Sequence, residues 1–285
     1  MSMPKLAYFG PDGSFCREAA RQYRGRRDME LVDFPTIYEL MKAVIEGKVL
    51  QGIVPLENSI EGSVTMTLDM FLEDNTLKIV QEIDLTVEHC LLAQSGTKLS
   101  DITDVLSHVQ ALAQCRSYLR STLVKANQIP AKSTSDAAMR VAGVGPVIHD
   151  GQNHVCAAIA NKKAASMYGL EILKAGIQDN DANMTRFVVI GHEQLPATGH
   201  DRTSIVFAAH RDQPGSLYDA LGEFAKRGIN LSKIESRPSK KVLGDYYFLV
   251  DVEGHPSELK VGEAIASIQS KSAFFKLLGA YPKYL

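Results

Sequence analysis

The segment Gln178-Asp-Asn-Asp-Ala-Asn-Met-Thr-Arg-Phe-Val-Val-Ile190 joins a polar loop to an apolar strand. Its first half is rich in Asp and Asn, whose side chains bond to nearby backbone groups and favour turns. Phe187 to Ile190 is an apolar, mostly β-branched run that predicts a buried strand. The junction would place Thr185 and Arg186 on a rigid support, as a site for an anionic substrate requires. In the alternative interpretation, Thr185 merely begins the strand and Arg186 is a solvated charge.

Length and composition indicate a two-domain protein that binds small molecules or proteins. The 285 residues exceed the prior of roughly 150 per domain, and 45% of them are apolar. A net charge of −2 lacks the basic excess of nucleic-acid-binding proteins. The first apolar run ends at Gly10-Pro11-Asp12, and no run is long enough to span a bilayer. We therefore expect a cytoplasmic protein without a nucleic-acid or membrane partner.

Cysteine and histidine residues show no metal-binding pattern. The histidines form no His-Glu-x-x-His arrangement, and no Cys-x-x-Cys pair occurs. We expect no metal and no cofactor, and we expect buried, hydrophobe-like thiols at Cys16, Cys90, Cys115 and Cys156.

Strand and helix patterns alternate through the first two thirds of the chain. Lys5 to Phe9 predicts a strand, and Ser14 can cap a following helix whose N-terminus could hold an anion. A strand at 52–56 leads into the polar loop 57–63 and then a helix, and if that loop is only a turn, Ser63 is the expected N-cap of this helix. The expected helices are 15–23, 37–45, 65–72, 111–119, 136–142 and one between Asn161 and Gly169, and the further strands are 31–34, 77–83, 87–92, 104–106 and 155–159.

Several polar loops follow predicted strands in this region. Ligands bind at the carboxyl ends of strands in open α/β sheets and at interfaces between lobes. We therefore expect two α/β lobes, roughly 1–85 with 175–195 and 86–174, whose loops meet in one cleft. Alternatively, loops such as 57–63 are simply turns rich in capping residues.

The last third predicts a separate domain after a polar linker at 196–201. Its order is βαββαβ, the ferredoxin-like plan, with strands at 203–209, 230–236, 245–252 and 274–281. Helices are expected at 217–226 and 258–269, the first with Ser216 as N-cap and Gly228 beyond its end. Taken alone, this pattern favours a small structural or dimerisation domain.

Four separated blocks of the sequence resemble the prephenate dehydratase family, in family order. They are residues 10–15, 54–64, 107–112 and 183–187. The resemblance implies a catalytic domain over 1–195 with two lobes, similar to periplasmic binding proteins, and an active site in their cleft. Two positions depart from the family pattern. Ser14 replaces the usual Thr and keeps the hydroxyl, whereas Val109 replaces the usual Pro and loosens the turn that carries Ser107 and Gln110.

The resemblance implies the decarboxylating dehydration of prephenate to phenylpyruvate, in phenylalanine biosynthesis, without a cofactor. It makes Thr185 the catalytic hydrogen-bond donor, with His108 as the rival because an imidazole titrates near neutrality. No room precedes the first strand for the chorismate mutase segment of some relatives, so we expect a monofunctional enzyme. The implied substrate-binding residues are Ser14, Asn58, Ser59, Ser107, His108, Gln110, Arg186 and Phe187.

C-terminal blocks are similar to the ACT domain that accompanies this enzyme, which implies a regulatory domain over 203–285. The resemblance implies phenylalanine as allosteric effector, with inhibition favoured over activation as end-product control. Because such domains pair at their sheet edges, we expect a homodimer or homotetramer. The implied effector-binding residues are Gly215, Ser216, Leu217, Asn230, Leu231, Glu235, Ser236 and Arg237.

Two other functions fit the same residues. An arogenate dehydratase would perform the same chemistry on a substrate with an amino group in place of the keto group, and no residue decides between them. A non-catalytic binding protein that senses amino acids could also keep the cleft and the ACT domain. It would not need a donor aimed at a leaving group.

Overall fold

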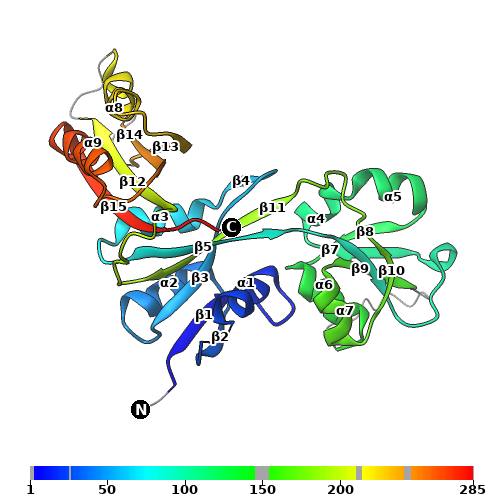
Figure 1. The fold of residues 1–285 in the computed structure, drawn as a ribbon. Helices are drawn as coiled ribbons and strands as arrows, with labels where there is room; N and C mark the ends of the chain where they lie inside the picture. Colours follow the sequence, from blue (N-terminus) through cyan, green and yellow to red (C-terminus); the bar gives the residue numbers. More distant parts are fainter. Residues whose placement is uncertain (1–2, 26, 145–153, 210–213, 241–244, 285) are drawn as a thin grey trace. The chain divides into compact units, whose positions relative to one another are not determined.

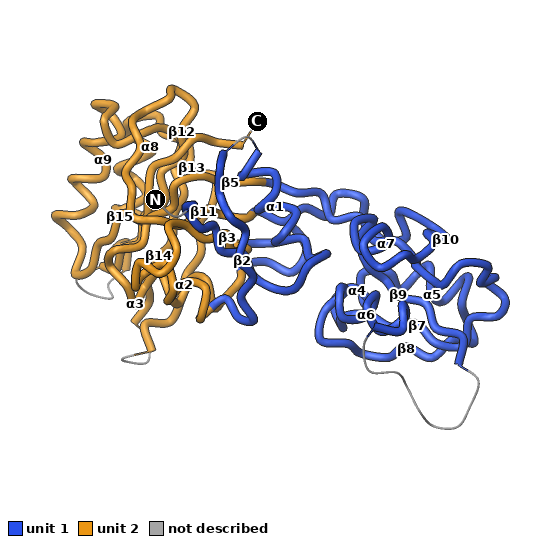
Figure 2. Tube along the Cα trace, turned by 90° about the horizontal axis from the view of Figure 1, so that it is seen from below, with its two compact units in different colours: residues 1–37, 57–63, 84–186 blue, residues 38–56, 64–83, 187–285 orange. Residues whose placement is uncertain are grey.

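The computed structural model of the chain describes residues 3–25, 27–144, 154–209, 214–240 and 245–284 (Figure 1). Two compact units divide the chain. Unit 1 contains residues 1–37, 57–63 and 84–186, and unit 2 contains 38–56, 64–83 and 187–285 (Figure 2). This division differs from the two lobes expected from the sequence, which stay a prediction.

One mixed sheet has the strand order β2-β1-β3-β11-β5, with β4 paired to β3. β1 (Lys5–Phe9) runs parallel to β2 (Glu30–Phe34). α1 (Phe15–Arg24) connects them, and its N-cap Ser14 accepts a hydrogen bond from the Arg17 N–H, as the sequence predicted. The other elements are β3 (Gln51–Asn58), β4 (Gly62–Ser63), β5 (Lys78–Thr86), β11 (Met184–Gly191), α2 (Ile37–Ile45) and α3 (Thr65–Glu73).

A second sheet, within unit 1, has the order β10-β6-β9-β7-β8. Side chains of β9 (Cys156–Ala160) alternate between two cores, with Ala157 and Ile159 on one face and Ala158 and Ala160 on the other. Both faces are therefore buried, as in a doubly wound sheet. The remaining elements are β6 (Cys90–Ala93), β7 (Asp104–Ser107), β8 (Asn127–Pro130), β10 (Glu171–Ala175), α4 (Val109–Gln114), α5 (Arg116–Thr122), α6 (Thr134–Val141), α7 (Lys162–Tyr168) and the 3₁₀ turn Leu99–Asp101.

The single helix expected at 111–119 is wrong, because the chain forms α4 and α5 with a break at Cys115. The loop after β10 satisfies the backbone groups that the break exposes. The Asp179 N–H donates to the Gln114 carbonyl at 2.6 Å, and the Asp179 carboxylate accepts from the Ser117 N–H at 3.0 Å. Hydrogen bonds from Asp179 in a distant loop thus stabilise the break at Cys115. No residue near Cys115 in the sequence indicates this break.

The C-terminal sheet, within unit 2, has the order β13-β14-β12-β15 with antiparallel neighbours. Its two helices contact each other and cover one face, as Figure 1 shows. This arrangement confirms the βαββαβ order. Its elements are β12 (Asp201–Ala209), α8 (Ser216–Ala225), β13 (Leu231–Pro238), β14 (Tyr246–Glu253), α9 (Leu259–Ser270) and β15 (Ser272–Pro282).

Two expected helix caps are wrong. Ser63 lies in β4, opposite Glu57, so Val64 is the N-cap of α3 and provides no side-chain hydrogen bond. Ser216 is the first residue of α8, and Gly215 takes the N-cap position with φ 92°. Glycine tolerates that backbone conformation, whereas a serine there would be strained.

Three of the four cysteines are buried as free thiols, and Cys156 is half-buried. Burial raises the pKa of Cys16 and of Cys115 to about 12, so both stay protonated at neutral pH. Among the described helices, none has the length and apolar character needed to cross a bilayer. The described residues also contain no group of three or more His, Cys, Asp or Glu side chains placed to hold a metal ion.

Candidate functional site

The end of β3 and the start of β11 hold two predicted site residues together. Asn58 Nδ2 lies 2.9 Å from Thr185 Oγ1 and 3.1 Å from the Met184 carbonyl oxygen. Ser59 clamps the same segments, because its N–H donates to the Met184 carbonyl and its hydroxyl donates to the Ala182 carbonyl. Residues 123 to 127 positions apart are thereby fixed in one hydrogen-bonded site within unit 1.

The hydrogen bonds of Asn58 define the direction of the Thr185 hydroxyl. Asn58 Oδ1 accepts from the N–H groups of Ile60 and Glu61, at 2.9 and 3.0 Å. Backbone N–H groups can only donate, so the Asn58 amide nitrogen must face Thr185. Thr185 Oγ1 is therefore an acceptor in this bond, and its own proton is directed elsewhere. A half-buried hydroxyl in this state can donate to a bound molecule.

Arg186 occupies the other face of β11. The strand begins at Met184, so Thr185 and Arg186 lie inside it rather than at its junction with the loop, and successive side chains point to opposite faces. Arg186 is 7% exposed, and its Nε lies 2.9 Å from Glu57 Oε1. Two neighbouring strands therefore carry two pairs, Asn58 with Thr185 on one face and Glu57 with Arg186 on the other. Phe187 is buried in the protein core.

The predicted residues near β7 are placed differently from one another. Ser107 is fully buried, and its hydroxyl donates to the Ile159 carbonyl at 2.7 Å. His108 is the N-cap of α4, where its Nδ1 accepts from the Gln110 N–H at 3.4 Å. Gln110 is exposed, and its Nε2 lies 3.4 Å from Glu61 Oε2. Gln110 thus contacts Glu61 in the loop after β3, whereas the Ser107 hydroxyl is hydrogen-bonded to the backbone of β9.

Three residues of this site were not predicted from the sequence. Gln114 Oε1 accepts from Asn183 Nδ2 at 2.9 Å, and Gln114 Nε2 donates to Glu61 Oε1 at 3.2 Å. Asn183 is fully buried and accepts from Asn58 Nδ2 at 2.8 Å. His89 Nε2 lies 2.9 Å from Gln114 Oε1. Asn183 stands in the quoted loop and could have been found, whereas nothing near Gln114 or His89 in the sequence marks them.

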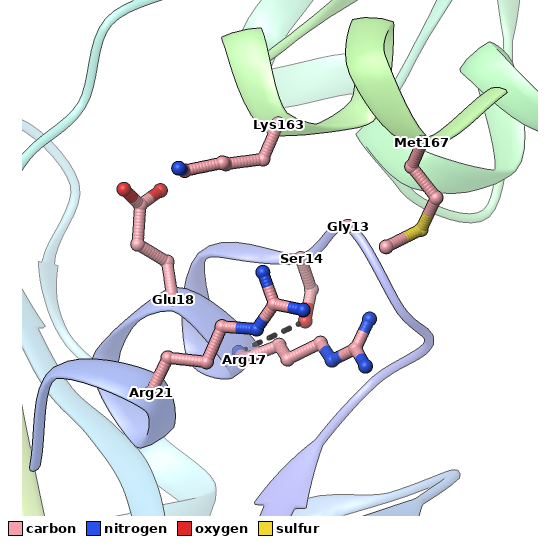
Figure 3. Close-up of a pocket in the computed structure, with 7 residues that line it drawn as sticks. All are labelled: Gly13, Ser14, Arg17, Glu18, Arg21, Lys163 and Met167. Carbon is pink, nitrogen blue, oxygen red and sulfur yellow. Dashed lines mark hydrogen bonds between the residues drawn. The ribbon is translucent and has the colours of Figure 1, made fainter. Parts of the chain in front are cut away.

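Ser14 lies at the edge of a pocket in unit 1 that contains more cations than anions. Figure 3 shows α1 on one side and α7 on the other. Asn161 Nδ2 donates to the Gly13 carbonyl at 2.9 Å, and the Tyr168 hydroxyl donates to the Asp12 carbonyl at 3.2 Å, which fixes the loop before α1 against α7. The lining side chains are Gly13, Ser14, Arg17, Glu18, Arg21, Lys163 and Met167.

The predicted effector residues lie in unit 2, around the start of α8 and along β13. In β13 the exposed fraction alternates, so Glu235 and Arg237 share one face and Ser236 lies on the other. Glu235 is 3.5 Å from the Lys233 Nζ. Gly215 is the N-cap of α8, Ser216 and Leu217 are its first two residues, and Asn230 precedes Leu231, the first residue of β13.

Arg237 joins β13 to α3 through Asp69. Arg237 Nη2 donates to Asp69 Oδ1 at 2.8 Å, and Lys240 Nζ donates to Asp69 Oδ2 at 2.7 Å. Burial opposes ionisation of Asp69, but the hydrogen bonds from Lys240 and Arg237 outweigh it and lower the pKa of this carboxyl. The C-terminal domain therefore contacts α3, the helix that follows residues 57–63 in the sequence.

Further polar contacts within unit 2 fasten the C-terminal sheet to α3 and β5. Arg202 forms an ion pair with the buried Glu82. Lys276 donates to the carbonyls of Phe71 and Asp74 at the end of α3, and burial lowers its pKa to about 8. Gly279 lies so close to β5 that a β-carbon would approach the Ile79 carbonyl oxygen to 2.2 Å. The C-terminal sheet is therefore packed tightly against these elements.

Comparisons with known proteins agree over nearly the whole chain. The family described as prephenate dehydratase matches residues 6–195, and the ACT domain matches residues 203–269. A bifunctional chorismate mutase/prephenate dehydratase of Aquifex aeolicus is 42% identical over 281 residues, which cover 99% of this chain and 74% of that protein.

Two solved structures share the fold. The prephenate dehydratase of Arthrobacter aurescens in complex with L-Phe has a TM-score of 0.87 at 34% identity, covering 98% of this chain and 90% of that one. A protein described as GqqA, a novel type of quorum quenching acylase, has a TM-score of 0.84 at 30% identity, covering 98% of both chains. The same fold is thus associated with more than one activity.

Proposed function

The chain belongs to the prephenate dehydratase family, and we propose that it converts prephenate to phenylpyruvate in phenylalanine biosynthesis, under control by phenylalanine. The observation that carries this proposal is the hydrogen bond from Asn58 to Thr185. It leaves the Thr185 proton available to the substrate.

The reaction needs positioning and one hydrogen-bond donor. The ring carboxylate leaves as carbon dioxide, and the electron pair of its C–C bond enters the ring. The ring C–O bond breaks, and the departing hydroxide takes up a proton from solvent to become water. Because the product is aromatic, the driving force lies in the substrate, and the enzyme has to hold two anionic groups and stabilise the leaving oxygen.

Thr185 serves as the donor to the leaving oxygen. A threonine hydroxyl has a pKa far above neutrality, so it acts as a positioned hydrogen-bond donor rather than a general acid. Its bond strengthens as negative charge develops on the departing oxygen, which is the condition for lowering the barrier. His108 is the rival donor, but it caps α4 in this structure.

The other predicted residues bind and orient the substrate. Arg186 would hold one carboxylate through its guanidinium group. This role requires the substrate to share or displace Glu57, and it requires the guanidinium to reach the substrate from the face of β11 opposite Thr185. Asn58 and Ser59 hold the donor, and Gln110 extends from the facing helix α4. Ser14, Ser107 and Phe187 complete the proposed set.

Phenylalanine binds the C-terminal domain in this proposal and inhibits the enzyme. The L-Phe complex of the Arthrobacter aurescens protein supports the effector. The contact between Arg237 and Asp69 supports a route by which the effector segment influences α3. To act, phenylalanine must bind one state of the enzyme more tightly than another.

The assembly and location are also proposed. Strands β13 and β15 form the edges of the C-terminal sheet, and pairing of such edges between copies would give a homodimer or homotetramer. We also propose a cytoplasmic location.

The direct test is incubation of the purified protein with prephenate at neutral pH, followed by the phenylpyruvate absorbance in alkali. Product formation above the uncatalysed rate is expected. Parallel reactions with arogenate separate the two dehydratase activities, since a higher kcat/KM for arogenate would overturn the choice of substrate. Binding of prephenate without turnover would favour the non-catalytic binding protein. Deacylation of a quorum-sensing signal without prephenate turnover would favour the acylase.

A further inference from the structure

His89 is a buried imidazole that the proposed reaction does not use directly. It is 3% exposed, and the edge-to-face ring of Phe15 lies 6.2 Å away between centroids. Its backbone N–H donates to Gln178 Oε1 at 3.0 Å, and its carbonyl accepts from the Ile177 N–H at 3.0 Å. Both the ring and the backbone of His89 are therefore held in place.

The hydrogen bonds between His89 and Thr185 form one continuous chain within unit 1. His89 Nε2 contacts Gln114 Oε1, which also accepts from Asn183 Nδ2, each at 2.9 Å. Asn183 Oδ1 accepts from Asn58 Nδ2 at 2.8 Å, and Asn58 Nδ2 donates to Thr185 Oγ1 at 2.9 Å.

Groups with only one hydrogen-bonding role fix the direction of this chain at both ends. Backbone N–H groups orient Asn58, so Asn183 must present its oxygen to Asn58 and its nitrogen to Gln114. The Glu61 carboxylate, which is an acceptor when ionised, attracts the Gln114 nitrogen. Both constraints turn the Gln114 oxygen toward His89, so Nε2 of His89 must carry the proton.

The environment of His89 Nδ1 indicates that the imidazole does not serve stability alone. Among the described residues, Nδ1 has no hydrogen-bond partner although it is buried. Burial also lowers the pKa of His89, which favours the neutral imidazole with one proton. A buried unsatisfied acceptor costs free energy that an apolar side chain of similar size would avoid. Residues that break such a rule are often functional.

We propose that His89 is a positioning residue for the dehydration, acting through Gln114 and Asn183 to hold Asn58 and keep the Thr185 proton directed at the substrate. This inference rests on the proposed function. His89 touches neither substrate nor leaving group. Its contribution is an N–H that holds the Gln114 amide in the orientation that Asn183 and Glu61 also favour.

The first test measures steady-state kinetics of substituted proteins with prephenate. His89→Leu removes the donor at similar volume and should lower kcat about tenfold with KM changed less than about twofold, the size expected for one hydrogen bond. His89→Gln offers an N–H near the position of Nε2 and should recover most of kcat. A matched core control, Leu119→Ala, should lower the melting temperature while kcat stays within about twofold.

A double-mutant cycle tests the route. If Gln114→Met and His89→Leu act on one chain of hydrogen bonds, the double variant should have nearly the kcat of the more impaired single variant. Independent effects that multiply would overturn the proposal, as would full kcat in His89→Leu. If wild-type protein shows no turnover of prephenate, the proposed function fails instead, which distinguishes the two.

Wild-type protein provides a test that does not depend on folding of any variant. In a long-range ¹H–¹⁵N spectrum at neutral pH, His89 should show a protonated Nε2 and an unprotonated Nδ1. The opposite tautomer, or a doubly protonated ring, would overturn the proposal.

Discussion

The polar contacts around Thr185 in unit 1 differ in kind from those that fasten the C-terminal sheet in unit 2. In unit 1, neutral amides and one hydroxyl connect Asn58, Asn183 and Thr185 through bonds that each have a defined donor and acceptor. In unit 2, ion pairs such as Arg202 with Glu82 and Arg237 with Asp69 join the C-terminal sheet to α3 and β5. An ion pair attracts over a range of geometries and weakens with salt, whereas an amide bond fixes direction. Hydrogen bonds of fixed direction suit the Thr185 donor, which must point at one substrate atom. Ion pairs that tolerate different geometries suit a domain that responds to an effector.

The largest effect is expected when the Thr185 hydroxyl, the last group in the chain of hydrogen bonds, is removed. Thr185→Ala should lower kcat about 100- to 1,000-fold, as loss of one donor to a developing oxyanion does. KM should change only a few-fold, because Asn58 and Arg186 remain. Steady-state kinetics with prephenate measures both values. Thr185→Ser is the matched control and should retain most of the rate. Abolished activity in His108→Ala with near-normal Thr185→Ala would give the donor role to the imidazole.

The next substitution reverses the direction of the hydrogen bond between residue 58 and Thr185 without changing the shape of the side chain at position 58. Asn58→Asp replaces the donor by an acceptor, so the Thr185 hydroxyl would donate to the carboxylate and no longer to the substrate. We expect kcat to fall about 10- to 100-fold, a smaller loss than removal of the donor. Asn180→Asp is the control, because the side-chain oxygen of Asn180 accepts from the Ala182 N–H and an aspartate oxygen can do the same. Equal rates of Asn58→Asp and wild type would show that hydrogen-bond direction is unimportant.

A weaker effect is expected from the ionic contact in unit 2. Asp69→Asn keeps the size of the side chain but weakens its bonds to Arg237 and Lys240. The phenylalanine concentration for half-maximal inhibition should rise about fivefold, within the usual range of coupling energies, while the rate without phenylalanine stays within about twofold. Inhibition curves provide the measurement, with Glu73→Gln on the exposed side of α3 as control. An unchanged curve would remove Asp69 from the route.

The smallest expected effect concerns stability and pH. Because the pKa of Lys276 is about 8 in the folded protein and higher when unfolded, the unfolded chain binds more protons between these values. Stability from this residue therefore rises with pH above about 8, with a slope of at most about 1.4 kcal/mol per pH unit. In denaturant unfolding at pH 7, 8, 9 and 10, the free energy of unfolding of wild type should rise relative to that of Lys276→Met as the pH increases. Parallel curves would contradict the prediction.

Local signals predicted the elements whose ends they cap. Ser14 begins α1, and Asn161 and Gly169 bound α7 as expected, because each cap uses bonds within a few residues. The alternation of β1 and α1 and the βαββαβ order of the last third were equally visible. The break at Cys115 was not, since it depends on Asp179, far along the chain. Nor was the placement of Ser63, which pairs with Glu57 across a short hairpin.

In the candidate site, too, the sequence predicted single residues but not the contacts between residues far apart in the chain. Asn58 and Thr185 stood out as unusual polar residues beside predicted strands, and they are hydrogen-bonded. That Arg186 faces the other side of β11 follows only from where the strand begins. Gln114 sits in what looks like an ordinary helix, and His89 in what looks like an ordinary apolar run. Their importance depends entirely on partners.

The amino-acid sequence by itself determined the order of elements, the residues able to cap them and the family to which the chain belongs. These depend on short windows of residue type and spacing, where each residue acts on near neighbours. Tertiary structure decided which donor meets which acceptor, from Asn58 with Thr185 to His89 with Gln114. Such pairs are separated by 25 to 127 positions, and packing brings them within 3 Å. No local preference encodes that choice.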